Sequence, residues 1–149
     1  MSDDRLLLDT MLGKLTTYLR MCGYDATYAL DRGVEADDEV LALAEAEDRR
    51  IITRDAVMAA RAEDAILLTG REITEQLRQV KAAGLSLTLG EPTRCSNCNG
   101  RLERVTPGEE VRDSAPDPSE QTVWRCRDCG QLFWKGSHWD DVAARLASL

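Results

Sequence analysis

The feature that most constrains the fold is a pair of short cysteine motifs in the second half of the chain. Four of the five cysteines form two Cys-x-x-Cys motifs, Cys95 with Cys98 and Cys126 with Cys129. A tetrahedral Zn²⁺ site needs four thiolates about 2.3 Å from the metal, and each motif presents two of them from one tight turn. Asn99-Gly100 and Gly130 follow the motifs and tolerate the left-handed backbone that such turns often require. The spacing therefore predicts a zinc ribbon built on a structural Zn²⁺.

Other uses of these cysteines fit the sequence less well. Disulfides are unusual in a cytoplasmic protein, which is what we expect this chain to be, and a redox Cys-x-x-Cys motif does not normally occur as a spaced pair. Four protein ligands leave no open position for water, so the predicted zinc stabilises the fold and is not the catalyst. Its binding supplies folding energy that so short a module lacks. Cys22, the fifth cysteine, lies on the apolar face of a predicted helix and is expected in the core.

The part of the chain before the cysteines alternates strand-like and helix-like segments. Short apolar runs predict strands at residues 6–9, 24–30, 50–53 and 65–69. Apolar residues at helical spacing predict helices at residues 12–22, 37–49 and 71–84. Strands separated by helices imply right-handed crossovers and a mainly parallel sheet covered on both faces. The predicted fold class is therefore α/β.

Gly90 and Pro92 mark the predicted boundary between two modules. We assign residues 1–91 to the α/β domain and residues 92–149 to the zinc-ribbon module. Within the second module, residues 106–121 are rich in Pro and acidic residues and predict a mobile polar loop. The tail from His138 to Leu149 carries apolar residues at helical spacing and predicts a C-terminal helix.

The charge of the chain bears on its partners. The net charge is −8, and residues 1–92 account for most of it, with 11 Lys and Arg against 18 Asp and Glu. Nucleic-acid binding normally needs a basic surface. With 3 Lys against 16 Arg, the acidity fits adaptation to high salt, where a Debye length of roughly 3 Å or less weakens repulsion. An ordinary acidic cytosolic protein is the alternative.

The sequence gives no sign of a membrane partner. No apolar run reaches the length needed to cross a bilayer, and the acidic start does not resemble a signal peptide or an anchor. We therefore expect a cytoplasmic location.

Aspartates follow two of the predicted strands. Asp9 comes directly after one apolar run and Asp55 lies just past another, while Asp37 begins a predicted helix. Parallel strands deliver their carboxyl ends to one edge of a sheet, where sites are built. Converging carboxylates repel one another unless a hard cation such as Mg²⁺ or Mn²⁺ neutralises them, and such an ion can promote phosphodiester hydrolysis. By position alone, chance placement among 27 acidic residues and a helix N-cap role for Asp37 stay open.

Longer runs carry a family resemblance. The runs LLLDTMLGKLTTYLRMCGYD, DDEVLALA and RRIITRD occur in this order, and a Trp-x-Gly-Ser-His-Trp signature spans residues 134–139. In these motifs nearly the whole chain resembles the PIN-like ribonuclease domain found at the C-terminal end of the Mut-seven exonuclease and in small stand-alone prokaryotic proteins. That family appends a zinc ribbon with this signature. The resemblance implies a PIN-like α/β fold and metal-dependent cleavage of RNA.

The family's acidic positions carry over onto three residues, Asp9, Asp37 and Asp55. Asp37 is preferred to its neighbour Asp38 because of its place in the pattern. PIN nucleases often have a fourth acid after a later strand, for which Glu72 and Glu75 are the available residues.

Basic and aromatic residues are the candidates for RNA contacts. Lys14, Arg20 and Arg54 lie near the predicted acidic site and can hold phosphates, although for each one taken singly a solvated helix face or pairing with acids is the simpler explanation. His138 and Trp139 are further candidates, with packing inside the ribbon as the alternative. More arginines and tryptophans surround the cysteine motifs: Arg94, Arg101, Arg104, Arg125, Arg127, Trp124 and Trp134. This mixture suits unpaired RNA.

The sequence thus predicts a metal-dependent ribonuclease with a structural zinc ribbon that aids RNA binding. Two alternatives stay open: a non-catalytic adaptor that binds RNA or protein, and a nuclease that acts on DNA by the same chemistry.

Overall fold

The computed structural model describes residues 4–112 and 114–149. Residues 1–3 of the acidic start and residue 113 of the predicted polar loop lie outside the described residues. Within the described part, no helix is both long enough and apolar enough to span a membrane.

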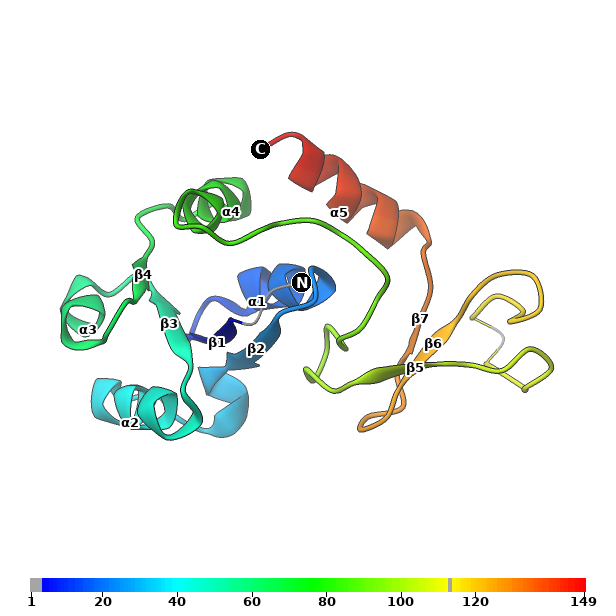
Figure 1. The fold of residues 1–149 in the computed structure, drawn as a ribbon, viewed down its shortest axis with the longest axis horizontal. Coiled ribbons are helices and arrows are strands. Elements are labelled where there is room, and N and C mark those ends of the chain that lie inside the picture. Colours follow the sequence, from blue (N-terminus) through cyan, green and yellow to red (C-terminus); the bar gives the residue numbers. More distant parts are fainter. Residues whose placement is uncertain (1–3, 113) are drawn as a thin grey trace.

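Four parallel strands form the first sheet, in the order β2-β1-β3-β4 (Figure 1). Their bounds are Arg5–Leu8 (β1), Asp25–Tyr28 (β2), Arg50–Thr53 (β3) and Ile66–Leu67 (β4). Because all neighbours pair in parallel, the residues that follow the four strands share one side of the sheet, which we call the carboxyl edge. The predicted α/β class with a parallel sheet is confirmed.

Helices connect these strands: α1 (Gly13–Met21), the 3₁₀ helix η1 (Ala29–Arg32), α2 (Asp37–Glu47), α3 (Ala56–Arg61) and α4 (Ile73–Ala82). The predictions missed α3 and η1, which span 6 and 4 residues and are too short to show a helical period. The strand expected at 65–69 is reduced to two residues, Ile66–Leu67.

Side-chain alternation along the strands divides the core in two. Leu6 and Leu8 belong to a cluster with residues of α1 and α4, whereas Leu7 belongs to a cluster with residues of α2 and α3. Since successive side chains of a strand point to opposite faces, helices cover both faces of this sheet.

A second, antiparallel sheet has the order β5-β6-β7, with bounds Leu102–Arg104, Trp124–Cys126 and Leu132–Phe133. It lies beside the parallel sheet, and helix α5 (Ser137–Ala147) leads back over the first domain (Figure 1). Val142 and Leu146 of α5 join the same core cluster as Leu6 and Leu8. The division at residues 91 and 92 stays a prediction.

Candidate active site and metal centre

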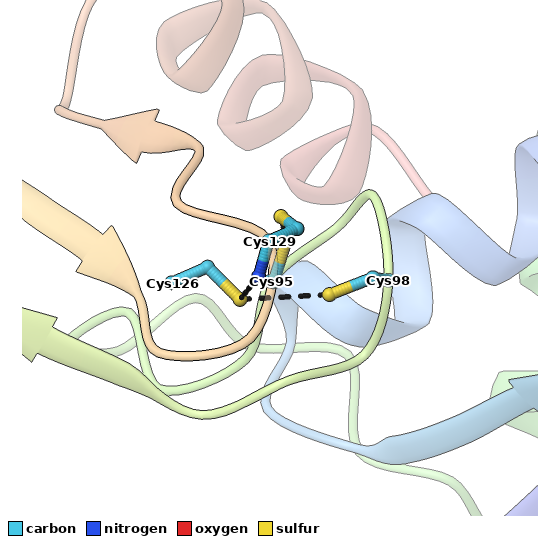
Figure 2. A group of neighbouring side chains, drawn as sticks. All are labelled: Cys95, Cys98, Cys126 and Cys129. Atoms are coloured by element: carbon cyan, nitrogen blue, oxygen red, sulfur yellow. Dashed lines mark hydrogen bonds between the residues drawn. The ribbon is translucent and has the colours of Figure 1, made fainter.

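The four paired cysteines come together at the base of the second sheet (Figure 2). Among the described residues they form the one group of three or more potential metal ligands whose ligand atoms all lie within 4.8 Å of one another. The Sγ atoms of Cys95 and Cys129 are 3.7 Å apart, and those of Cys98 and Cys126 are 3.5 Å apart. A tetrahedron with metal–sulfur bonds of about 2.3 Å has edges of about 3.8 Å. The cluster therefore fits a structural zinc site.

The two cysteine turns share one backbone pattern. Asn99 N–H donates to the Cys95 carbonyl at 2.9 Å, and Gly130 N–H donates to the Cys126 carbonyl at 3.1 Å. Asn99 and Gly130 both have left-handed backbones, with φ of 72° and 78°. Gly100 is required for a different reason, because a Cβ there would lie 2.8 Å from the Cys126 Sγ. The residues after each motif thus set the turn that aims its thiols.

Burial sets the chemistry of individual thiols. Cys95 is fully buried, and this burial raises the pKa of its thiol to about 12. A thiolate at Cys95 therefore needs a cation beside it, which Zn²⁺ supplies in a four-thiolate site. Cys22 is half-buried against the first core cluster, and burial raises the pKa of its thiol to about 12 as well. Its position agrees with the core role expected from the sequence.

The first cysteine turn docks on the outer strand β2. The Asn99 side chain accepts a hydrogen bond from Ala26 N–H at 3.0 Å and donates one to the Asp25 carboxylate at 2.8 Å. Arg20 donates from Nε to the Ala26 carbonyl at 2.8 Å and from Nη1 to the Ser96 carbonyl at 3.1 Å. β2 is an outer strand of its sheet, and outer strands leave backbone N–H and C=O groups unpaired unless another segment covers them. Asn99 of the first cysteine turn and Arg20 cover these groups of Ala26. Arg20 is only 4% exposed and links the two modules.

Asp25 is the charged centre of this contact. Burial alone would raise its pKa, but hydrogen bonds from Asn99 and Arg49 outweigh that effect and lower the pKa to about 2. The Arg49 Nη1 lies 2.8 Å from the carboxylate, and Arg94, which precedes the first cysteine, lies 3.7 Å away. Asp25 therefore stays ionised throughout the neutral pH range.

Replacement of Asn99 by Gly tests this docking, because Gly keeps the left-handed turn and removes only the side-chain bonds. We expect the free energy of unfolding to fall by about 1–3 kcal/mol, the cost of leaving buried polar groups unpaired. The deficit should be equal at pH 5 and pH 8, because stabilisation by Asp25 is complete above its ordinary pKa of 3.8 and fades only as pH falls toward 2. Urea unfolding of the zinc-loaded chain measures it. Asn97→Ala is the control, because Asn97 is exposed in the same turn and its amide makes a long contact of 4.0 Å with the Cys129 Sγ rather than a bond to β2. Equal stabilities for both variants would contradict the docking role.

At the carboxyl edge, a threonine links two of the three predicted aspartates. Asp9 extends the pairing of β1, since its N–H donates to the Ile52 carbonyl at 3.0 Å. The hydroxyl of Thr53, a fully buried residue at the end of β3, donates to Asp9 Oδ2 at 2.7 Å. The same hydroxyl accepts a hydrogen bond from Asp55 N–H at 3.0 Å. Sequence reasoning missed Thr53, although a polar residue that ends an apolar strand between two acids was a visible signal.

The Asp55 carboxylate caps the next helix. Its Oδ1 accepts hydrogen bonds from the N–H groups of Val57 at 2.9 Å and Met58 at 3.2 Å, which begin α3. Both bonds end on Oδ1, so the cap does not use Oδ2. Carboxylate oxygens are the ligands that Mg²⁺ and Mn²⁺ prefer.

The third aspartate lies at the start of α2, which leads from β2 back to the beginning of β3. Asp37 is half-buried there, whereas its neighbour Asp38 is exposed and forms an ion pair with Arg61 of α3. In the part of the chain that the structure describes, the three carboxylates do not gather within the 4.8 Å that unites the cysteines. The structure thus links Asp9 with Asp55 and leaves Asp37 outside that link.

The other predicted site residues are spread over both modules. Lys14 on α1 and Arg54 before Asp55 are exposed. His138 is exposed in the first turn of α5. Trp139 is half-buried, and the Lys135 ammonium lies over its ring, 5.2 Å from the ring centre. These two residues belong to the ribbon end of α5. Glu72 and Glu75 are both exposed at the start of α4.

Two of the tryptophans near the cysteines pack within the second module. Trp124 is 5% exposed on β6, and Trp134 packs against the small ribbon core of Val105, Val123 and Leu132. Gly136 leaves room for this packing, because a Cβ there would lie 2.9 Å from the Trp134 indole nitrogen.

Fold and site together define an α/β protein whose parallel sheet carries acids at its carboxyl edge and whose second sheet carries a four-cysteine cluster that fits a structural zinc site. The Mut7-C RNAse domain model matches residues 4–146, so the chain belongs to the Mut7-C RNase domain family. Membership implies a nuclease with RNA as its substrate. Neither a curated protein nor a solved structure matches the chain.

Proposed function

We propose that this protein is a metal-dependent ribonuclease that hydrolyses RNA phosphodiester bonds at the carboxyl edge, with Asp9, Asp37 and Asp55 as its catalytic carboxylates. The observation that supports this most strongly is the hydrogen-bonded link from the Asp9 carboxylate through the Thr53 hydroxyl to the backbone N–H of Asp55, at the ends of adjacent parallel strands in a Mut7-C RNase domain. In this proposal the four paired cysteines hold a structural Zn²⁺.

The proposed catalytic cation is Mg²⁺ or Mn²⁺, held by oxygen atoms of the three aspartates. When bound, such an ion lowers the pKa of water and stabilises the negative oxygens of a phosphodiester under attack. The chain's own part is to orient the ligands. Thr53 fixes the Asp9 carboxylate through a buried hydroxyl, and the α3 cap fixes Asp55. Orienting contacts of this type preserve the affinity of metal ligands.

RNA contacts in this proposal come from both modules. Lys14 and Arg54 are the phosphate-binding candidates, because they are exposed beside Asp9 and Asp55 in sequence. His138 and Trp139 contact RNA from the ribbon end of α5. Arg20 is assigned to docking of the cysteine turn and not to phosphate, because it is buried with its guanidinium on backbone carbonyls.

Cleavage of end-labelled RNA and DNA of equal sequence tests the proposed function. The zinc-loaded chain is incubated with Mg²⁺, with Mn²⁺ and without added metal, and in the absence of chelators that would remove zinc. We expect cleavage of single-stranded RNA that depends on added Mg²⁺ or Mn²⁺ and exceeds cleavage of DNA. RNA binding without turnover under every metal would favour the adaptor alternative.

A further inference from the structure

In the described part of the chain, the large apolar side chains that are most exposed share one kind of position in the fold. These residues are Leu30, Met11, Val57 and Leu67, with exposures of 48%, 87%, 66% and 42%. Each lies at or shortly after the carboxyl end of a different strand, and in this order they follow β2, β1, β3 and β4 across the sheet. We call these four residues the apolar rim. Scattered exposed apolar residues are ordinary, but a set confined to one edge marks a binding surface.

Met11 has an unfavourable backbone conformation. Its φ is 74°, a left-handed conformation that is unfavourable for any residue with a Cβ. Its N–H donates to the Tyr28 hydroxyl at 3.2 Å, and the Tyr28 ring lies against the Cα of Gly13. The loop after β1 is thus fixed from β2 while the Met11 side chain remains in solvent, where it gains nothing from burial. Strain of this kind clusters at ligand-binding sites.

The rim surrounds the proposed acidic site. Met11 lies two residues after Asp9, and Val57 lies two residues after Asp55 in the helix turn that Asp55 caps. In the proposed function, a phosphate bound at these carboxylates places its flanking nucleotides near both residues. Phosphates gain nothing from apolar contact, whereas the faces of unpaired bases do, and Met in particular adapts to aromatic rings.

The acidity of residues 1–92 limits how RNA can be held there. Residues 1–92 carry 11 Lys and Arg against 18 Asp and Glu, so phosphate contacts give this domain little net attraction. Contacts with base faces are independent of that charge, and duplex RNA conceals these faces in its stack. We propose that Met11 and Val57 contact the unpaired bases on either side of the scissile phosphate and so select single-stranded RNA with little regard to sequence. This inference rests on the proposed function, because it assumes that RNA is cut at Asp9 and Asp55.

Binding of two RNAs to the wild type and to one double variant tests the contact between the rim and the bases. The double variant Met11→Gln and Val57→Thr replaces both side chains by polar ones of similar size at exposed positions, so its thermal unfolding should match the wild type. The probe is a short fluorescent single-stranded RNA, beside the same RNA with abasic nucleotides in its centre. Binding is followed by anisotropy with zinc-loaded protein and without added Mg²⁺ or Mn²⁺.

The double variant should raise the Kd for intact RNA about tenfold, equivalent to about 1.4 kcal/mol, and the Kd for abasic RNA less than about twofold. Equal losses for both RNAs, or none for either, would overturn the base contact. So would unchanged RNA binding with a shift in sedimentation from dimer to monomer, because the rim would then join two copies of the chain. If the wild type cleaves RNA while the variant binds it normally, the rim inference fails and the proposed function stands. If the wild type cleaves under no metal, the proposed function fails, whatever the binding cycle shows.

Discussion

Replacement of Asp9 by Asn should reduce RNA cleavage by more than about 100-fold and leave the fold intact. Loss of a residue that merely orients a metal ligand typically costs 10–100-fold, and Asp9 is a proposed ligand itself. The amide oxygen can still accept the hydrogen bond that Thr53 donates at 2.7 Å, and the local cost is the hydrogen bond that Thr10 N–H donates to the other carboxylate oxygen at 2.8 Å. Initial cleavage rates with saturating Mg²⁺ or Mn²⁺ measure the effect, and circular dichroism checks the fold.

Asp48→Asn is the matched control. Asp48 is exposed just after α2, away from the carboxyl edge, and its φ of 52° suits Asn well. The same change of charge there should alter the rate less than about twofold, because distant exposed charges are largely screened. Comparable rates for wild type and Asp9→Asn would remove Asp9 from catalysis, and comparable losses in both variants would indicate a general charge effect.

Replacement of Cys95 by Ser should abolish stoichiometric zinc and unfold the second module. Structural zinc contributes about 10–16 kcal/mol in small peptides, far more than the few residues of the ribbon core can replace. Because the first cysteine turn also covers β2 through Asn99, the loss should spread to the first domain. We expect the unfolding temperature to fall by more than about 10 °C.

Cys22→Ala is the control for this variant. Cys22 is a half-buried thiol outside the cluster, so its replacement should retain one zinc per chain and change stability only slightly. Zinc content of purified protein and its thermal unfolding distinguish the two variants. A Cys95→Ser protein that kept both its zinc and its unfolding temperature would show that the four thiols do not act as one metal centre.

Periodicity and turn chemistry predicted most of the fold. The continuous apolar run of Leu6, Leu7 and Leu8 indicated a buried strand, and the structure places these side chains in two cores. The cysteine spacing predicted the thiol cluster, because each motif needs only its own local turn. These features depend on neighbours in sequence, and sequence patterns report such neighbours well.

Features that depend on distant partners were missed. Asn99 was predicted to help form a turn, but its side chain also covers Ala26 in another module. Arg20 was a candidate for phosphate binding, yet burial against the cysteine turn gives it a structural role. The apolar rim is equally nonlocal, because its four residues meet only through the order of the strands. Nothing in the chain near each residue indicates these partners.

The most direct test of a divalent cation site at the carboxyl edge is the stoichiometry of Mn²⁺ binding, read by electron paramagnetic resonance on zinc-saturated protein. The wild type and Asp48→Asn should bind the same number of Mn²⁺ ions with similar affinity, and Asp9→Asn should lose at least one of them. Identical Mn²⁺ binding by all three proteins would contradict the assignment of Asp9 as a metal ligand, whatever their cleavage rates.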